Sequence, residues 1–196
     1  MSESDFDISG LQSFSVDAQG QRLLPARWCP SPNFDARPPG ARVELLVVHC
    51  ISLPPGEFGT GCVHDLFLNR LDHQAHPYFE GLRELRVSAH LFVDRAGCVS
   101  QFVALRDRAW HAGVSHFQGR ERCNDFSIGV ELEGTDSGIY SDAQYQTLIA
   151  LSRCLFEHFP ALDSGAVVGH SDIAPGRKTD PGPGFDWVRL KRALPR

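Results

Sequence analysis

Two histidines end similar apolar runs of the sequence. His49 follows Leu45-Leu-Val-Val, and His170 follows Ala166-Val-Val-Gly. Each run is short and rich in β-branched residues, which is typical of a buried strand. Ligands bind at the ends of strands in an open α/β sheet, so two imidazoles at neighbouring strand ends could share one metal ion. The alternative is a pair of core histidines bonded to the backbone, and these two runs leave both interpretations open.

Asp180 favours the metal interpretation. It lies ten residues after His170 and directly before Pro181. A residue before proline is pushed out of the helical region, so Asp180 is expected in an extended segment with Lys178 facing the same way. Two neutral imidazoles and one carboxylate are three ligands that leave a fourth position open for water, the arrangement of a catalytic zinc site. Taken alone, Asp180 would be interpreted as a loop-capping residue.

A metal-activated water needs a nearby base, and one predicted strand offers two. Apolar residues alternate with others in Phe126-Ser-Ile-Gly-Val-Glu-Leu-Glu, which predicts a strand with two different faces. Glu131 and Glu133 share the face opposite the apolar residues. A carboxylate there could take the proton of the water and pass it to a leaving amine. The strand pattern does not choose between the two, and an ordinary surface glutamate is the alternative for either.

The elements that must position these residues alternate between strands and helices. This alternation predicts an α/β fold, a single domain over 1–196 with a central mixed β-sheet flanked by helices. Residues 1–40 are expected to form an irregular, Pro-rich N-terminal arm packed on the domain, and 53–61 a long loop. The expected elements are a strand at 44–49, a short helix at 62–71, a hairpin of 87–93 and 98–103 turning near Gly97, a strand at 126–133, a helix at 142–159 capped by Ser141 and Gln144, an apolar strand at 166–170 and a closing helix at 187–193.

Composition narrows the class of protein. The chain has 196 residues, 42% hydrophobic and 22% charged, which excludes a disordered or fibrous protein. The net charge of −5 without a basic stripe argues against nucleic-acid binding. No apolar run approaches the ~18 residues of a membrane span, and the acidic start lacks the apolar core of a secretory signal. Six cysteines without a C-x-x-C pair exclude a zinc finger and suit reduced thiols, so we expect a cytoplasmic protein, taken as a monomer.

Five blocks, in order along the chain, resemble the cytosolic zinc N-acetylmuramoyl-L-alanine amidases of the AmpD type. The blocks are VVHCISLPPGEFG, LRVSAH, RAWHAGVSHFQGRERCNDFSIGVELEGTD, YSDAQYQTL and GHSDIAPGRKTDPGPGFDW, which cover most of residues 43–188. This family shares its fold with phage-type amidases and peptidoglycan recognition proteins. The resemblance implies that His49, His170 and Asp180 bind Zn²⁺.

The resemblance also assigns roles to other residues. It implies that Glu131 rather than Glu133 is the acid/base catalyst and that Lys178 stabilises the developing oxyanion. Where such enzymes often have Asn after the first histidine, this chain has Cys50, whose side chain is expected to point away from the metal. Four residues are assigned to the substrate: Arg86 and Arg122 on the carboxylates of its peptide stem, and Trp110 and His111 beside the pocket.

The implied function is zinc-dependent hydrolysis of the amide bond between the lactyl group of N-acetylmuramic acid and the L-alanine of the stem peptide. Small 1,6-anhydro-muropeptides, recycled from the cell wall into the cytosol, are the expected substrates. Three alternatives remain at this point. They are an exported or phage-type amidase acting on polymeric peptidoglycan, a non-catalytic peptidoglycan-binding module of the same fold, and an unrelated metal-free α/β binding protein.

Overall fold

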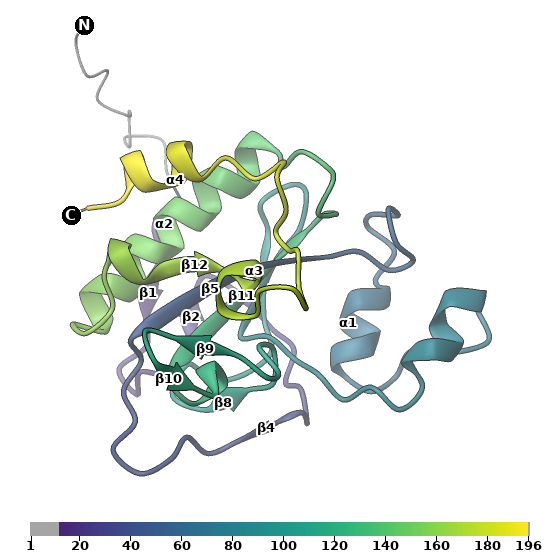
Figure 1. Ribbon diagram of the computed structural model, residues 1–196, viewed down its shortest axis with the longest axis horizontal. Helices are drawn as coiled ribbons and strands as arrows, with labels where there is room; N and C mark the ends of the chain where they lie inside the picture. The colour runs from purple at the N-terminus through teal and green to yellow at the C-terminus, as the bar shows by residue number, and fades with distance from the viewer. Residues whose placement is uncertain (1–11, 196) are drawn as a thin grey trace, which may run out of the picture.

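A six-stranded mixed sheet forms the centre of the computed structural model, which describes residues 12–195 (Figure 1). Its strand order is β12-β5-β11-β6-β7-β3, which confirms the predicted mixed α/β fold. The strands of this sheet are β3 (Arg27–Trp28), β5 (Leu45–Ile51), β6 (Leu91–Val93), β7 (Val99–Gln101), β11 (Ser127–Glu133) and β12 (Val167–Gly169). Three two-stranded ribbons add β1 (Ser15–Val16) with β2 (Leu23–Leu24), β4 (Phe34–Asp35) with β8 (Arg108–Ala109), and β9 (His116–Phe117) with β10 (Arg120–Glu121).

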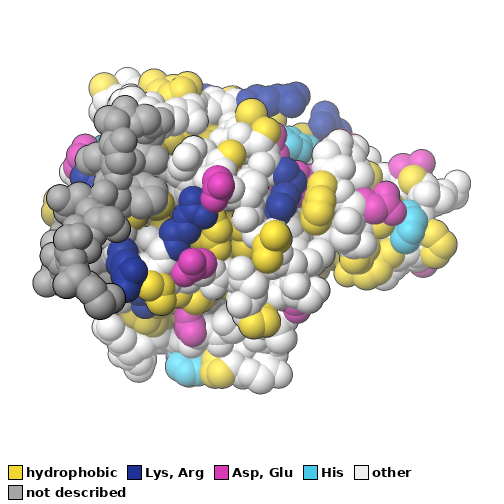
Figure 2. All heavy atoms as spheres, turned by 90° about the horizontal axis from the view of Figure 1, so that it is seen from above, with side chains coloured by type: hydrophobic (Ala, Val, Ile, Leu, Met, Phe, Trp, Pro, Cys, Tyr) yellow, Lys and Arg dark blue, Asp and Glu magenta, His cyan; other side chains and the backbone are white. Residues whose placement is uncertain are grey.

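Helices cover the sheet and connect its strands. The α-helices are α1 (Cys62–Phe67), α2 (Asp142–His158), α3 (His170–Ile173) and α4 (Trp187–Ala193), and the 3₁₀ helices are η1 (Pro77–Leu82), η2 (Cys123–Asp125) and η3 (Ser164–Ala166). In Figure 1, α2 and α4 lie together on one side of the sheet. Helix α1 packs against the sheet, because its Val63, Leu66 and Phe67 share a hydrophobic cluster with Phe92 of β6. Figure 2 shows a lobe that protrudes from one end of the body. No helix within the described range has the length and apolar character that crossing a bilayer requires.

Strand β5 lies inside the sheet, and its first four residues, 45–48, are apolar because both faces of the strand are buried there. It pairs in parallel with β11 on one side and with β12 on the other. Leu46 and Val48 pack in the core under α2, whereas Leu45 and Val47 pack on the opposite face with a second group that includes Phe126. Burial on both faces therefore explains why a parallel central strand has a continuous apolar run in its sequence.

Helix α2 begins where its capping residues predicted. The Ser141 hydroxyl accepts the Gln144 N–H, and the Gln144 side chain accepts the Ser141 N–H, both at 3.1 Å. The predicted hairpin of β6 and β7 packs against this end of the helix. It turns at Gly97, whose φ is +84° and where an added Cβ atom would come within 2.9 Å of the Ala143 carbonyl oxygen, so a side chain has no space there.

Several elements differ from the sequence-based expectations. Helix α1 ends at Phe67 rather than continuing to residue 71, and Asn69 just beyond it adopts a positive φ of 55°. His170 begins the short helix α3 instead of ending a strand. The N-terminal arm contributes an edge strand, because β3 pairs in parallel with β7. Residues 1–11 of the predicted arm lie outside the described residues, and the proposed domain limits remain a prediction.

The capping box yields a test of this fold. We expect Ser141→Ala to lower the free energy of unfolding by about 1 kcal/mol, because the Gln144 N–H loses its acceptor. Urea unfolding followed by circular dichroism measures the change. Gln146→Ala on the exposed side of the same helix is the control and should leave stability unchanged, so an equal effect of both substitutions would contradict the capping role.

Candidate metal centre and active-site cleft

The parallel register brings the candidate residues into one row across the sheet. Glu131 of β11 lies directly opposite His49 of β5, so both side chains project from the same face. In β12, Gly169 pairs with Val48, and His170 follows as the next residue. The row therefore continues from Glu131 through His49 to His170 at the end of three parallel strands.

Asp180 reaches this row from the loop that follows α3. Its carboxylate Oδ2 lies 3.1 Å from Nδ1 of His49 and 3.1 Å from Nδ1 of His170. The two Nδ1 atoms are 3.0 Å apart. The Asp180 carbonyl also accepts the Ser171 N–H at 2.9 Å, which ties the loop back to α3.

These three atoms fit a tetrahedral zinc ion. Zn–N and Zn–O bonds of about 2.0–2.1 Å imply neighbouring donors separated by about 3.3 Å, close to the distances seen here. Two nitrogens and one carboxylate oxygen are also a donor set that zinc prefers. The structure thus brings together the predicted triad of His49, His170 and Asp180 as a group able to hold a metal.

The protonation states of the triad suit a cation. Burial lowers the pKa of His49 to about 4, so its imidazole is neutral near pH 7 and free to act as a ligand. Burial opposes ionisation of Asp180, but the contacts of its carboxylate with the His170 ring and then the His49 ring outweigh burial and hold its pKa below the ordinary value. The site therefore presents one negative charge at Asp180 and a neutral imidazole at His49.

Glu131 is the carboxylate beside the triad. The residue is half-buried, but its Oε2 is shielded from solvent and has no hydrogen-bond partner among residues 12–195. Burial, reinforced by the charge of Asp180 and opposed by Lys178, raises its pKa well above 4.5. A carboxyl group poised to hold and release a proton has the property that an acid/base catalyst requires.

Glu133 has a different environment on the same strand face. Its Oε1 accepts the Gly59 N–H at 2.6 Å, and its Oε2 accepts the Arg95 N–H at 3.1 Å. Both carboxylate oxygens of Glu133 therefore hold the backbone of neighbouring loops in place. This difference supports Glu131 as the acid/base residue.

A cleft of about 580 Å³ opens over the triad. One wall is largely apolar and comes from the α1–η1 region and the segment after it; it includes Leu66, Phe67, Tyr78, Leu82, Leu85 and Val87. The other wall is polar and includes Thr135, Asp136, Arg177, Lys178 and Thr179. A ligand with both apolar and charged parts fits such a cleft.

The four residues predicted to serve the substrate fall into two groups: two line the cleft and two do not. Trp110 and His111 line the cleft, as does Lys178. Arg86 and Arg122 are exposed and are not among the residues that line it. The Arg86 guanidinium donates to the carbonyls of residues 83 and 85, and Arg122 pairs with Asp125 at 3.2 Å. Their contact with a substrate stays a prediction.

Two lining residues were not expected there. Cys50, predicted to point away from the metal, lines the cleft without joining the ligand set, and burial raises its pKa to about 12. Arg177 donates to the carbonyls of Ala112 and Val114 at 2.7 and 2.6 Å. The only sequence signal for Arg177 is its place beside Lys178.

Comparison with known proteins identifies the class. Residues 39–183 match the family described as N-acetylmuramoyl-L-alanine amidase. The 1,6-anhydro-N-acetylmuramyl-L-alanine amidase AmpD of Escherichia coli is 56% identical over 169 residues, which cover 86% of this chain and 92% of that protein. The chain therefore belongs to the N-acetylmuramoyl-L-alanine amidase family.

Solved structures agree with this assignment. The crystal structure of a selenomethionine AmpD derivative superimposes with a TM-score of 0.88 at 53% identity, covering 92% of this chain and 99% of that one. A complex of the amidase AmiD from E. coli with the substrate anhydro-N-acetylmuramic acid-L-Ala-D-gamma-Glu-L-Lys has a TM-score of 0.57 at 28% identity. It covers 91% of this chain and 65% of AmiD.

The environment of Glu131 predicts a pH-dependent stability. Because its pKa is raised on folding, the folded state holds a proton that the unfolded state releases, so stability falls as pH rises above about 4.5. In chelator-treated protein, Glu131→Gln removes this loss, and its stability advantage over wild type should grow from pH 5 to pH 8. Urea unfolding at both pH values measures the difference.

The matched control for that comparison is Glu157→Gln on the exposed surface of α2. This variant should keep the pH dependence of the wild-type protein. If Glu131→Gln and wild type lost stability in parallel, the raised pKa of Glu131 would be wrong.

Proposed function

We propose that this chain uses a bound Zn²⁺ to hydrolyse the amide bond between the lactyl group of 1,6-anhydro-N-acetylmuramic acid and the L-alanine of the stem peptide. One observation carries the proposal: the donor atoms of His49, His170 and Asp180 lie 3.0–3.1 Å apart beside Glu131. The 56% identity to an anhydro-muropeptide amidase from E. coli supports the substrate class.

The chain's own residues supply the proton transfers. A bound zinc ion would provide Lewis-acid activation of the attacking water and of the scissile carbonyl. Glu131 accepts the proton of that water on its unpartnered oxygen and then donates it to the amine nitrogen of L-alanine. The raised pKa of Glu131 suits both steps, because the carboxyl group must exist in each protonation state during one turnover.

Lys178 supplies a positive charge to the same reaction. It lies two residues before Asp180 and lines the cleft with it. An ammonium group there stabilises the oxygen of the scissile carbonyl as it becomes negative, in addition to the metal. Asp180, the proposed metal ligand, and the Lys178 ammonium come from one loop, so the local backbone sets their relative position.

The substrate class suggests where the enzyme works. We propose that it acts on small anhydro-muropeptide fragments in the cytoplasm, as part of cell-wall recycling. The AmiD complex supports a fragment of this type as the ligand, since that amidase of the same fold holds an anhydromuramyl tripeptide. That the chain is a monomer and binds no nucleic acid stays a prediction.

Product analysis tests the proposed function. Purified protein incubated with an anhydromuramyl tripeptide should release the free peptide and the anhydro sugar, identified by mass spectrometry. Prior treatment with a chelator should abolish release and Zn²⁺ should restore it, whereas Glu131→Gln should bind zinc without turnover. Faster release from intact sacculi would favour the exported-amidase alternative, and binding without any release would favour a recognition module.

Removing the Lys178 ammonium tests its role. We expect Lys178→Met to lower kcat about 100- to 1,000-fold with little change in KM, because the lost donor acts on charge that develops in the transition state. Lys191→Met is the matched control, since Lys191 is the chain's other lysine and lies exposed on α4. A wild-type kcat in Lys178→Met would rule out the oxyanion role.

A further inference from the structure

Two consecutive residues, His111 and Ala112, bond to the two histidines of the triad. Their contacts lie on the side of each imidazole ring that faces away from Asp180. Nε2 of His49 lies 2.9 Å from Nδ1 of His111, and Nε2 of His170 lies 3.1 Å from the carbonyl oxygen of Ala112. Both histidines thus point Nδ1 toward Asp180 and use Nε2 for an outer contact. One short segment, residues 111–112, contacts both.

These outer contacts determine which nitrogen carries the proton. A carbonyl oxygen only accepts, so His170 donates from Nε2–H and keeps its Nδ1 lone pair for a cation. The same arrangement at His49 requires Nε2–H to donate to His111. His111 then carries its own proton on Nε2, which donates to the Ser127 hydroxyl 3.1 Å away. The buried β11 strand is thereby linked through His111 to His49.

The His111 ring packs closely against the sheet. It lies over Gly129 of β11, where a Cβ atom would come within 2.5 Å of the ring. Only glycine leaves room for this approach. His49 and His111 meet edge to face, with ring centroids 5.0 Å apart.

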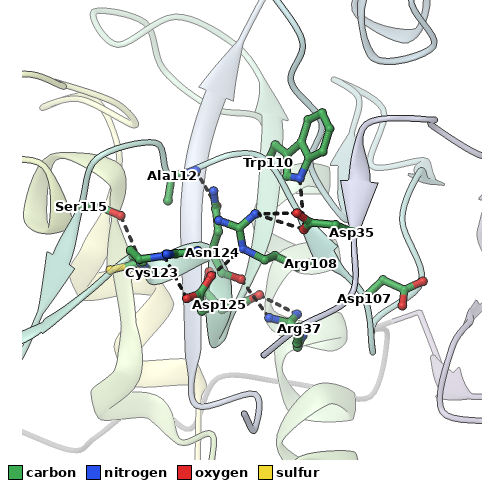
Figure 3. Close-up of polar contacts among 12 residues, drawn as sticks. Asp35, Arg37, Asp107, Arg108, Trp110, Ala112, Ser115, Cys123, Asn124 and Asp125 are labelled. Atoms are coloured by element: carbon green, nitrogen blue, oxygen red, sulfur yellow. Dashed lines mark hydrogen bonds and ion pairs between the residues drawn. The ribbon is translucent and has the colours of Figure 1, made fainter. Parts of the chain in front are cut away.

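A single side chain holds the backbone of the segment. Asn124 Oδ1 accepts the N–H of His111 at 3.2 Å and that of Ala112 at 2.8 Å. Arg37 donates in turn to the Asn124 carbonyl at 3.0 Å, and Figure 3 shows these groups converging with the Arg108 ion pairs around η2. The segment is therefore fixed by side chains that touch neither the metal ligands nor the cleft.

We propose that His111 is a positioning residue of the metal centre, which orients His49 and fixes its Nε2–H tautomer. This inference rests on the proposed zinc site. It revises the expectation that His111 serves the substrate, because both of its ring nitrogens are already engaged by His49 and Ser127. Outer hydrogen bonds of this kind set the orientation and basicity of a ligating histidine.

Zinc affinity of the full-length protein, measured by competition with a chromophoric chelator, tests the proposal. His111→Leu removes the acceptor for His49 and should raise the Zn²⁺ dissociation constant about 10- to 100-fold. His111→Asn places an acceptor oxygen near the position of Nδ1 and should recover most of that loss. Rescue by Asn but not by Leu separates hydrogen bonding from packing.

His90 provides a matched control. His90 is buried like His111, and the two ring centroids lie 5.7 Å apart, but it bonds to Gly129, Asp107 and Arg37 rather than to a metal ligand. His90→Leu should therefore lower stability without changing zinc affinity. Long-range ¹H–¹⁵N spectra of the zinc-loaded wild-type protein should show His49 and His170 protonated on Nε2.

Three results would overturn the inference while leaving the proposed function intact. They are wild-type zinc affinity in His111→Leu, affinity in His111→Asn as low as in His111→Leu, and spectra in which His49 binds zinc through Nε2. A wild-type protein that binds no zinc would instead refute the proposed function itself, so the two failures are distinguishable.

Discussion

Two imidazole nitrogens and a carboxylate oxygen lie 3.0–3.1 Å apart in a buried site, and the rest of the structure must keep them there. The two Nδ1 atoms present lone pairs to one another, so their own interaction does not hold them together. Parallel pairing of β12, β5 and β11 does so instead, because the ladder bonds fix the positions of His49 and the residue before His170. A one-residue slip would turn His49 to the opposite face of the sheet.

The groups around this triad satisfy each other's hydrogen bonds almost completely. His111, Ser127 and Asn124 are all buried. Ser127 of β11 is hydrogen-bonded to His111, and Asn124 is hydrogen-bonded to the backbone of the 111–112 segment. A buried polar network destabilises the folded state when some of its groups lack hydrogen-bond partners, and it makes the structure rigid when all of them are paired. Among residues 12–195, Oε2 of Glu131 and Nε of Arg37 are the atoms of this region that are buried without a partner, and Glu131 is the one beside the triad. A rigid surround with one unsatisfied carboxylate is the arrangement expected where a proton must be transferred.

Local patterns in the sequence predicted much of this. The apolar runs before His49 and His170, the two-faced strand with Glu131, and the Ser141 capping box each depend on neighbouring residues only, and the structure contains all of them. The pairing of β3 with β7 was missed because a two-residue strand has no periodicity to detect. That Arg86 lies outside the residues lining the cleft was not foreseen, because its position depends on the path of an irregular segment, and its contact with a substrate stays a prediction.

The choice between Glu131 and Glu133 shows where such reasoning stops. The two residues are identical in type, and the alternation of β11 assigns them to the same face. Their difference comes from segments distant in sequence, since the backbone N–H groups of Gly59 and Arg95 reach Glu133 but not Glu131. Those bonds tie Glu133 to two loops, whereas Oε2 of Glu131, which lies opposite His49, has no hydrogen-bond partner among residues 12–195. Strand β11 thereby carries one carboxylate held by backbone N–H groups and, two residues before it, the carboxylate that we propose as the acid/base catalyst, and only the tertiary contacts distinguish them.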